Sequence, residues 1–337
     1  MRDNGSSTEE LLDLLQDATS LDVVREFLRA KGLKISAGNW KDMRDVRLRP
    51  YIEDGSVSIA ELAKLLSDAE ECGDQHIFLY DCGQANAIEL LDRARVNAAI
   101  ARNGLEALLT EPQIKSMPPA PTIVDIRWET ATADLSLTIK EVEVRTKRKP
   151  LREVTRNDKL FKIYQYEKVR AVNVAKLHRS GVLEVRIHSR DNTTRYDADL
   201  RRFFYQLQDF FPFVRFREVS LTTAKGEMWR RRDELTDLIR YTNASITDEQ
   251  GNILSATTGS NKANLSQSNV GKSIDQLMEE DENAYCSQSN LWFKKSASLS
   301  TDVHVIMHGE VNELALTAKC SATDYKYVLD QIKHFNR

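Results

Sequence analysis

The spacing of apolar residues changes near residue 122, and this change constrains the fold more than any other feature of the chain. Before it, apolar positions recur three to four residues apart, as in SLDVVREFLRAK, which is typical of amphipathic helices. After it they alternate, as in LSLTIKEVEVR, which is typical of strands with one buried face. We therefore expect an α+β fold, with an N-terminal orthogonal helical bundle followed by one or two α+β domains built on antiparallel sheet.

The expected domain boundaries follow from composition. The stretch EPQIKSMPPAPT, residues 111–122, holds three prolines within four residues, and its residues 113–122 are expected to form a linker. The linker would separate a helical bundle over residues 1–112 from an antiparallel sheet with one helix over residues 123–216. A second α+β segment with a closing helix is expected over residues 217–337.

Local signals place several element ends. Ser20 and Ser58 each precede an apolar-periodic run and are expected to cap helices, because a serine oxygen accepts from the first free backbone N–H groups. Gly32 fits the position after a helix, where a positive φ favours glycine. Residues 178–181 separate two alternating runs and are expected to form a hairpin turn.

Whole-chain composition excludes several classes of protein. The net charge is −3 over 337 residues, so any nucleic-acid binding must come from local basic patches. Four cysteines are too few for a disulfide framework. No apolar run is long enough to span a membrane, and no secretory signal is visible. We expect a soluble intracellular protein of the cytoplasm, nucleoid or nucleus, with no membrane contact, and self-association stays open.

Residues about 20–80 are expected to form a compact, charge-polarised helical docking module. Residues 20–50 carry eight cationic against four anionic side chains, and residues 51–75 carry one against seven. The two groups could neutralise one another on adjacent helices, or the cationic face could dock on DNA or on an acidic protein surface. The candidate docking residues are Arg25, Arg29, Lys31, Lys34, Lys41, Arg44 and Arg47.

Residues 145–170 form the second basic segment, with ten cationic against three anionic side chains and with Phe161, Tyr164 and Tyr166 among them. Cations that neutralise phosphate and aromatic rings that stack on bases are what a nucleic-acid groove needs. A solvated hairpin tip whose aromatic side chains face the core explains the same pattern without a ligand. The candidate nucleic-acid-binding residues are Arg145, Lys147, Arg148, Lys149, Arg152, Arg156, Lys159, Lys162, Tyr164 and Arg170. A weaker third patch is Arg230–Arg232, after Trp229.

Metal binding is not expected, and no cofactor is predicted. Cys72, His76 and Cys82 lie close in sequence, but a structural zinc site needs a second pair of ligands, which the sequence lacks. His304 and His308 fall on one face of an expected strand without a third ligand nearby.

Catalytic motifs are sparse, so an enzyme is not favoured. Glu141, Glu143 and Lys147 on an expected strand, with Asp125 or Asp134 upstream, are similar to the carboxylate and lysine set of Mg²⁺-dependent nucleases. The usual Glu-x-Lys spacing is absent, and an alternating strand face accounts for the residues without chemistry. No phosphate-binding loop, dinucleotide-binding fingerprint or nucleophile elbow occurs.

Two family resemblances bear on the N-terminal module. SLDVVREFLRAKGLKISAGNWKDMRDVRLRPYI is similar to the SAP helix-turn-helix motif, although Trp40, Met43 and Val46 stand where that motif has lysine and leucines. Residues 15–85 resemble the N-terminal pyrin-like domain of the CENP-N family of centromere proteins, and the resemblance includes the segment Gln75-His76-Ile77-Phe78-Leu79-Tyr80. That resemblance implies a β-rich domain from Ile123 onward, binding to nucleosomes and DNA, and a protein partner at the C-terminal domain.

These observations favour a non-catalytic nucleic-acid-binding adaptor. Residues 145–170 would contact the DNA backbone, the helical module would dock on DNA or on a protein, and the C-terminal sheet would mediate assembly with a protein partner. The alternative is a protein-interaction scaffold with a death-fold-like module, and a Mg²⁺-dependent nuclease is third.

Overall fold

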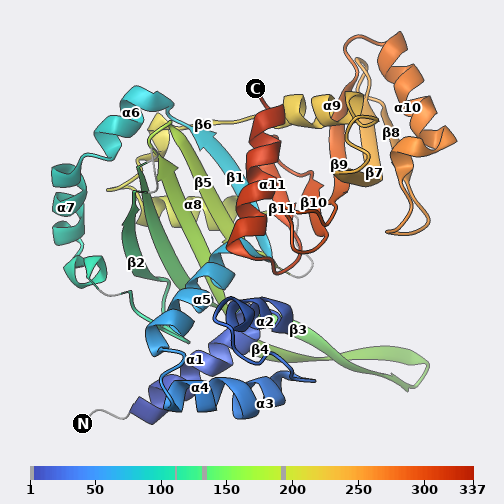
Figure 1. The fold of residues 1–337 in the computed structure, drawn as a ribbon. Coiled ribbons are helices and arrows are strands. Elements are labelled where there is room, and N and C mark those ends of the chain that lie inside the picture. The colour runs from blue at the N-terminus through green and yellow to red at the C-terminus, as the bar shows by residue number, and fades with distance from the viewer. Residues whose placement is uncertain (1–3, 111, 131–134, 191–194) are drawn as a thin grey trace. The chain divides into compact units, whose positions relative to one another are not determined.

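The structure is a computed structural model that describes residues 4–110, 112–130, 135–190 and 195–337. It has an α+β fold whose paired strands run antiparallel, as expected from the change in period (Figure 1). The chain forms two compact units. Unit 1 consists of Met1–Tyr80 together with Glu218–Arg337, and unit 2 consists of Asp81–Arg217. Because unit 1 is built from two separated stretches, unit 2 is an insertion in it.

The N-terminal part of unit 1 is a helical module with its own apolar core. Leu12, Leu15, Leu28, Met43 and Leu62 are completely buried in that core. Ser20 and Ser58 cap their helices as expected, and Ser58 forms a reciprocal capping box with Glu61. The elements are α1 (Asn4–Ala18), α2 (Leu21–Ala30), α3 (Trp40–Asp42), the π-helix η1 (Met43–Leu48), α4 (Arg49–Glu53) and α5 (Ile59–Cys72).

The π-helical turn in this module has a chemical cause. Pro50 has no backbone N–H, so it cannot donate to the carbonyl of Val46 four residues earlier, and its ring crowds that carbonyl. The helix widens, and the N–H of Arg49 reaches the carbonyl of Arg44 five residues back. The carbonyl of Val46 is thereby left for a side-chain donor, which proves to be Arg47.

The second part of unit 1 is an antiparallel sheet in the order β1-β11-β10-β9-β7-β8. Strand β1 comes from the N-terminal stretch and pairs with β11 from the far end of the chain, Gln75 opposite Leu316. The strands are β1 (Gln75–Asp81), β7 (Ile239–Thr247), β8 (Ile253–Thr257), β9 (Tyr285–Phe293), β10 (Val303–Met307) and β11 (Glu313–Leu316), with the two-residue β6 (Arg217–Glu218) beside β1. The helices are α9 (Thr222–Arg230), η4 (Leu265–Gln267), α10 (Asn269–Glu280) and α11 (Ala322–Phe335).

Unit 2 is an antiparallel sheet in the order β2-β3-β4-β5, with α8 packed on it. Phe203 and Phe204 of α8 are buried, as are Leu137 and Leu177 on the strands. The hairpin expected at His178–Gly181 joins β4 to β5. The elements are α6 (Gly83–Leu90), α7 (Arg93–Arg102), η2 (Glu106–Leu109), β2 (Thr122–Glu129), β3 (Ser136–Arg156), β4 (Lys159–His178), β5 (Val182–His188), α8 (Asp197–Gln206) and η3 (Phe213–Arg215).

The units divide the chain at other places than the composition indicates. The helices α6 and α7 belong to unit 2 and not to the N-terminal module, and residues 75–81 form a strand. Residues 112–121 connect η2 to β2 within unit 2, where the N–H of Gln113 donates to the carbonyl of Val124. Glu111, at the start of the proline-rich stretch, lies outside the described residues.

Candidate nucleic-acid interface

The basic segment 145–170 is the outer half of one long hairpin. Strands β3 and β4 pair along their whole length, from Ser136 opposite His178 to Arg156 opposite Lys159. Only the inner half also pairs with β2 and β5, so in the described part of the chain residues 146–168 form a two-stranded ribbon. We call this ribbon the arm; Figure 1 shows it in green, extending past the other strands of unit 2.

The tip of the arm is a two-residue turn. Asn157 and Asp158 have φ values of 49° and 56°, and positive φ at both central residues defines the type I′ turn that suits the twist of a hairpin. Asparagine and aspartate tolerate this conformation better than other residues with a side chain. An Asn-Asp dipeptide between two alternating runs favours such a turn, so the sequence carries a signal for the tip of the arm that the sequence analysis did not use.

A β-bulge sorts the charges of the arm. Pro150 lies opposite Tyr164 and Arg152 opposite Ile163, so Leu151 is an extra residue on β3. Side chains alternate between the faces of a strand, and the extra residue reverses the alternation of β3 beyond it. Arg152 therefore comes onto the face that already carries Lys149. This basic face consists of Lys147, Lys149, Arg152, Arg156 and Lys159, with Glu167 as its acidic member.

The opposite face of the arm mixes cations with aromatic rings. Arg148 lies over the ring of Tyr164 at 4.2 Å, a cation–π contact that holds the guanidinium against the ribbon. Lys162 pairs with Glu153 at 3.1 Å, and this contact raises the pKa of Lys162. Tyr166 is 70% exposed, so its ring is open to solvent.

Two of the candidate binding residues hold the base of the arm. The side chain of Arg145 is only 9% exposed, contacts Glu143 at 2.5 Å and donates to the carbonyl of His188 at 2.6 Å. Arg170 donates to the carbonyl of Lys115 at 2.8 Å. Both guanidinium groups therefore serve the attachment of the arm, and the structure does not place them with the basic face.

The outer cations are less constrained. Lys149 contacts Glu167 at 3.4 Å, and an exposed pair of this kind contributes little to stability and is easily exchanged for another anion. Arg152, Arg156 and Lys159 have no ion pair with any residue that the structure describes. Phe161, on the same face, is 50% exposed and so does not face a core.

A buried ionic network anchors the arm to α8. Glu141 is completely buried and receives two hydrogen bonds from Arg202, at 2.7 and 2.9 Å. Burial alone would raise the pKa of Glu143, but Arg145, Asn173 and Arg202 more than offset it, so its pKa lies below the usual value. Each carboxylate is thus matched by a guanidinium, which is what makes burial of the pair tolerable.

The described acidic side chains that suggested a Mg²⁺-dependent nuclease are paired with arginine side chains. Glu141 and Glu143 bind Arg202 and Arg145, and Asp125 pairs with Arg127. Asp134 lies outside the described residues. The described ranges contain no cluster of three acidic, histidine or cysteine side chains arranged to hold a metal ion.

The remaining metal candidates are used in packing. His76 pairs with the buried Glu313, and Cys320 donates its thiol to the carbonyl of Cys72. Burial raises the pKa of the Cys82 thiol to about 11. Burial also lowers the pKa of His304, whose ring stacks on Trp292.

Three of the seven docking candidates in the helical module are already in ion pairs. Arg44 contacts Glu9 and Asp13 of α1, and Lys31 contacts Glu61 at 2.5 Å. The partners of Arg44 thus come from α1 and not from the acidic residues 51–75. Within the described part of the chain, the docking candidates without an ion pair are Arg29, Lys34, Lys41 and Arg47.

The third basic patch is neutralised locally. Arg230 pairs with Glu227, Arg231 with Glu234 at 2.9 Å, and Arg232 with Asp275. These pairs leave the arm as the most strongly cationic surface among the three basic segments.

Neither a protein-family model, a curated protein nor a solved structure matches the chain. Among the described residues, no helix is both long enough and apolar enough to cross a membrane.

Proposed function

We propose that the protein is a non-catalytic nucleic-acid-binding adaptor whose arm contacts the phosphate backbone of a DNA duplex. The observation that carries the proposal is the sorting of five cations onto one face of a projecting two-stranded ribbon, against the single carboxylate of Glu167. A two-stranded β-ribbon fits the major groove of B-DNA, where its lysines and arginines reach the phosphates on either side.

The length and stiffness of the arm support this assignment. Strand residues advance about 3.3 Å each, so the outer part of β3 spans several phosphates of a duplex. The base of the arm is fixed by the network around Glu141 and Arg202, so little conformational freedom is lost on binding. Exposed Phe161 and Tyr166 would stack on bases of an opened or single strand.

The resemblance of residues 15–85 to the CENP-N family supports a nucleosomal duplex as one DNA to test. The alternative function, a protein-interaction scaffold, is favoured by the helical module itself. Because Arg44 and Arg49 are paired with Glu9, the module presents fewer available cations than its sequence carries. We assign phosphate contact to the arm, and docking on DNA or on a protein partner to the module.

A salt series tests the proposal. Fluorescently labelled duplex and single-stranded DNA are titrated with the full chain, and the dissociation constant is followed by anisotropy. We expect the double variant Arg152→Gln/Arg156→Gln to weaken duplex binding at least tenfold. We also expect it to reduce the slope of log K against log salt by about 0.9 for each phosphate that the variant no longer neutralises.

The matched control removes the same charge elsewhere. Lys262 and Lys272 are exposed in unit 1 and have no ion pair with described residues, so Lys262→Gln/Lys272→Gln should leave binding nearly unchanged. Equal losses in both double variants would show that only net charge matters, and DNA binding that is absent or insensitive to salt would overturn the proposal. Adding Mg²⁺ should leave the bound DNA intact.

A further inference from the structure

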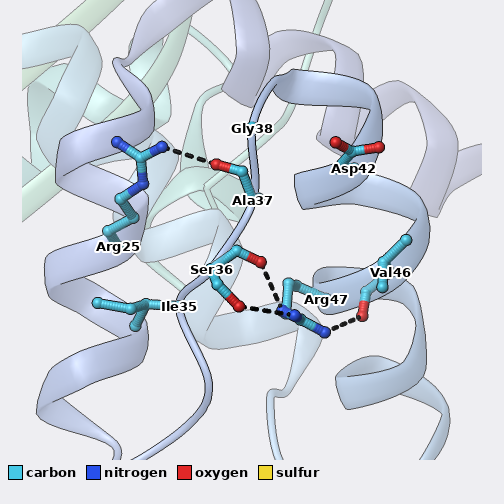
Figure 2. A pocket seen from close by; sticks show the side chains of 8 residues that line it. All are labelled: Arg25, Ile35, Ser36, Ala37, Gly38, Asp42, Val46 and Arg47. Carbon is cyan, nitrogen blue, oxygen red and sulfur yellow. Dashed lines mark hydrogen bonds between the residues drawn. The ribbon is translucent and has the colours of Figure 1, made fainter.

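The helical module, to which the proposed function assigns docking, has a hollow on its surface. It lies between α2 and the turn and helix that follow, has a volume of about 620 Å³ and is open to solvent (Figure 2). Small-molecule and peptide side-chain pockets commonly have volumes of this order. Its lining includes Arg25, Ile35, Ala37, Asp42, Val46 and Arg47.

Arg47 is fixed at the edge of the hollow without being neutralised. Its guanidinium donates to the carbonyl of Ser36 at 2.9 Å, to the hydroxyl of Ser36 at 2.9 Å and to the carbonyl of Val46 at 3.1 Å (Figure 2). A guanidinium has five N–H donors, so two remain after these three bonds. All three acceptors are neutral, and no described carboxylate pairs with Arg47. Arg47 therefore presents a fixed positive charge with two N–H donors that no described residue uses.

This arrangement depends on the π-helical turn. In a regular α-helix the carbonyl of Val46 would accept from the backbone N–H four residues on, which Pro50 does not have. The freed carbonyl is one of the three acceptors that hold Arg47. Single π-turns within helices are frequently found at functional sites.

The floor of the hollow is apolar. A second cation, Arg25, connects α2 to the turn that follows it. Ile35, Ala37 and Val46 line it, and Val46 is 54% exposed although it is a large aliphatic residue on a helix. Arg25 of α2 donates to the carbonyl of Ala37 at 2.8 Å and pairs with the exposed Asp22 at 2.7 Å. The backbone N–H groups of residues 35–38 donate to no acceptor in the described part of the chain.

We propose that this hollow binds a short acidic peptide segment of a partner protein. An aliphatic side chain of the peptide would lie against Ile35 and Val46, and a neighbouring carboxylate would take the two remaining donors of Arg47. Asp42 lines the same hollow and can accept a peptide N–H. An apolar floor and a hydrogen-bond acceptor suit a peptide better than a nucleic-acid backbone, which offers neither aliphatic side chains nor amide donors.

The test uses the full chain and a fluorescein-labelled peptide of sequence Asp-Glu-Asp-Leu-Leu-Asp-Glu-Asp, with binding followed by anisotropy. Arg47→Gln removes a charge-assisted contact and should weaken binding on the order of tenfold or more. The matched control is Lys64→Gln, which changes the charge of the same module equally at an exposed position that is neither in the hollow nor among the docking candidates, and it should alter affinity less than about twofold.

Two further changes, one in the protein and one in the peptide, distinguish a peptide site from a general attraction between opposite charges. Val46→Ser removes exposed apolar surface without disturbing the core, so it should weaken the peptide several-fold while the thermal melt stays unchanged. A peptide with both leucines replaced by serine should bind more weakly to the unaltered protein. If Arg47→Gln and Lys64→Gln weaken binding equally, or if Val46→Ser has no effect, the proposal is overturned.

The proposal does not depend on nucleic-acid binding by the arm. Arg152→Gln/Arg156→Gln should leave peptide affinity unchanged, so a failure of the arm to bind DNA leaves this test intact. If Arg47→Gln instead weakens duplex DNA as strongly as it weakens the peptide, and DNA displaces the peptide, the hollow is a phosphate site and the peptide assignment is wrong.

Discussion

Cationic side chains in this protein have three different roles, and the residue type alone does not indicate which one applies. Arg145 is buried beside Glu143 and holds the base of the arm. Arg47 is held by neutral oxygens and keeps its charge available. Lys31 is neutralised by Glu61, and the carboxylate of Glu61 also completes the capping box of α5. The partner of each cation, more than its position in the sequence, therefore decides whether it is available to bind.

Glu61 gives a pH-dependent prediction at this scale. Hydrogen bonds from Lys31 and from Ser58 lower its pKa from 4.5 to about 2. Since the folded form holds the lower pKa, the stabilising effect is complete above pH 4.5 and is lost as the pH falls through about 2. Glu61→Gln should therefore melt at a lower temperature than the unaltered chain at neutral pH, with the difference shrinking across that window. A difference that stays constant from neutral pH to about pH 2 would contradict this account.

At the scale of elements, the arm shows how one extra residue can organise a surface. Regular alternation along β3 would place Arg152 and Arg156 on the face opposite Lys147 and Lys149. The bulge at Leu151 brings all four to one face. In an uninterrupted ribbon Arg152 and Arg156 would instead join Arg148 and Lys168 on the opposite face, so the bulge decides which face carries the outer arginines.

Insertion of one threonine between Ile163 and Tyr164 tests this organisation. The new residue would lie opposite Leu151, abolish the bulge and turn the outer part of the arm over, so that Arg152, Arg156 and Lys159 leave the face of Lys149. On the opposite face they join Arg148 and Lys168, so Lys149→Gln should weaken duplex binding by the unaltered chain but have little effect in the insertion variant, measured by anisotropy.

Deletion of Leu151 is the matched control for that insertion. It also removes the bulge, but Arg152 stays opposite Ile163 and the faces keep their composition. Lys149→Gln should therefore weaken duplex binding by the deletion variant as much as it weakens binding by the unaltered chain. If Lys149→Gln has the same effect in the insertion and the deletion variants, the sorting of charge between the faces does not decide which cations bind DNA.

Local elements were predictable from the sequence because their causes are local. The cap at Ser58 needs only Glu61 three residues later, and the turn at His178–Gly181 needs only its flanking strands. The bulge at Leu151 was not predictable, since it depends on how β4 pairs with β3. The strand at Gln75–Asp81 was missed for a similar reason: its short apolar run acquires a partner, β11, only near the other end of the chain.

In the whole molecule, the two stretches that form unit 1 come together at the point where unit 2 is inserted. The N–H of Val219 donates to the carbonyl of Leu79 at 3.0 Å, so the chain leaves and re-enters unit 1 at adjacent points. The pairing of β1 with β11 and the packing of Cys72, Ile77 and Leu79 in the larger core complete the unit.

This geometry predicts that unit 2 can be removed. A chain in which residues 81–217 are replaced by a short glycine-serine linker should fold with one cooperative thermal transition and dispersed NMR signals. Residues 1–80 alone should expose Ile77 and Leu79, because β11 is missing, and should bind a hydrophobic dye. An excised chain without a cooperative transition would show that unit 1 depends on the insertion for its stability.

The pairing of β1 with β11 also sets an order of events during synthesis. The helical module can form as soon as it leaves the ribosome, because its core closes among residues 11–66. Strand β1 emerges directly afterwards, yet the edge that pairs with β11 stays open until the whole of unit 2 and most of the remaining chain have been made. A nascent chain therefore carries an apolar strand with an open edge for most of its translation, which makes that strand the natural target of a chaperone and the place where slow translation would favour aggregation.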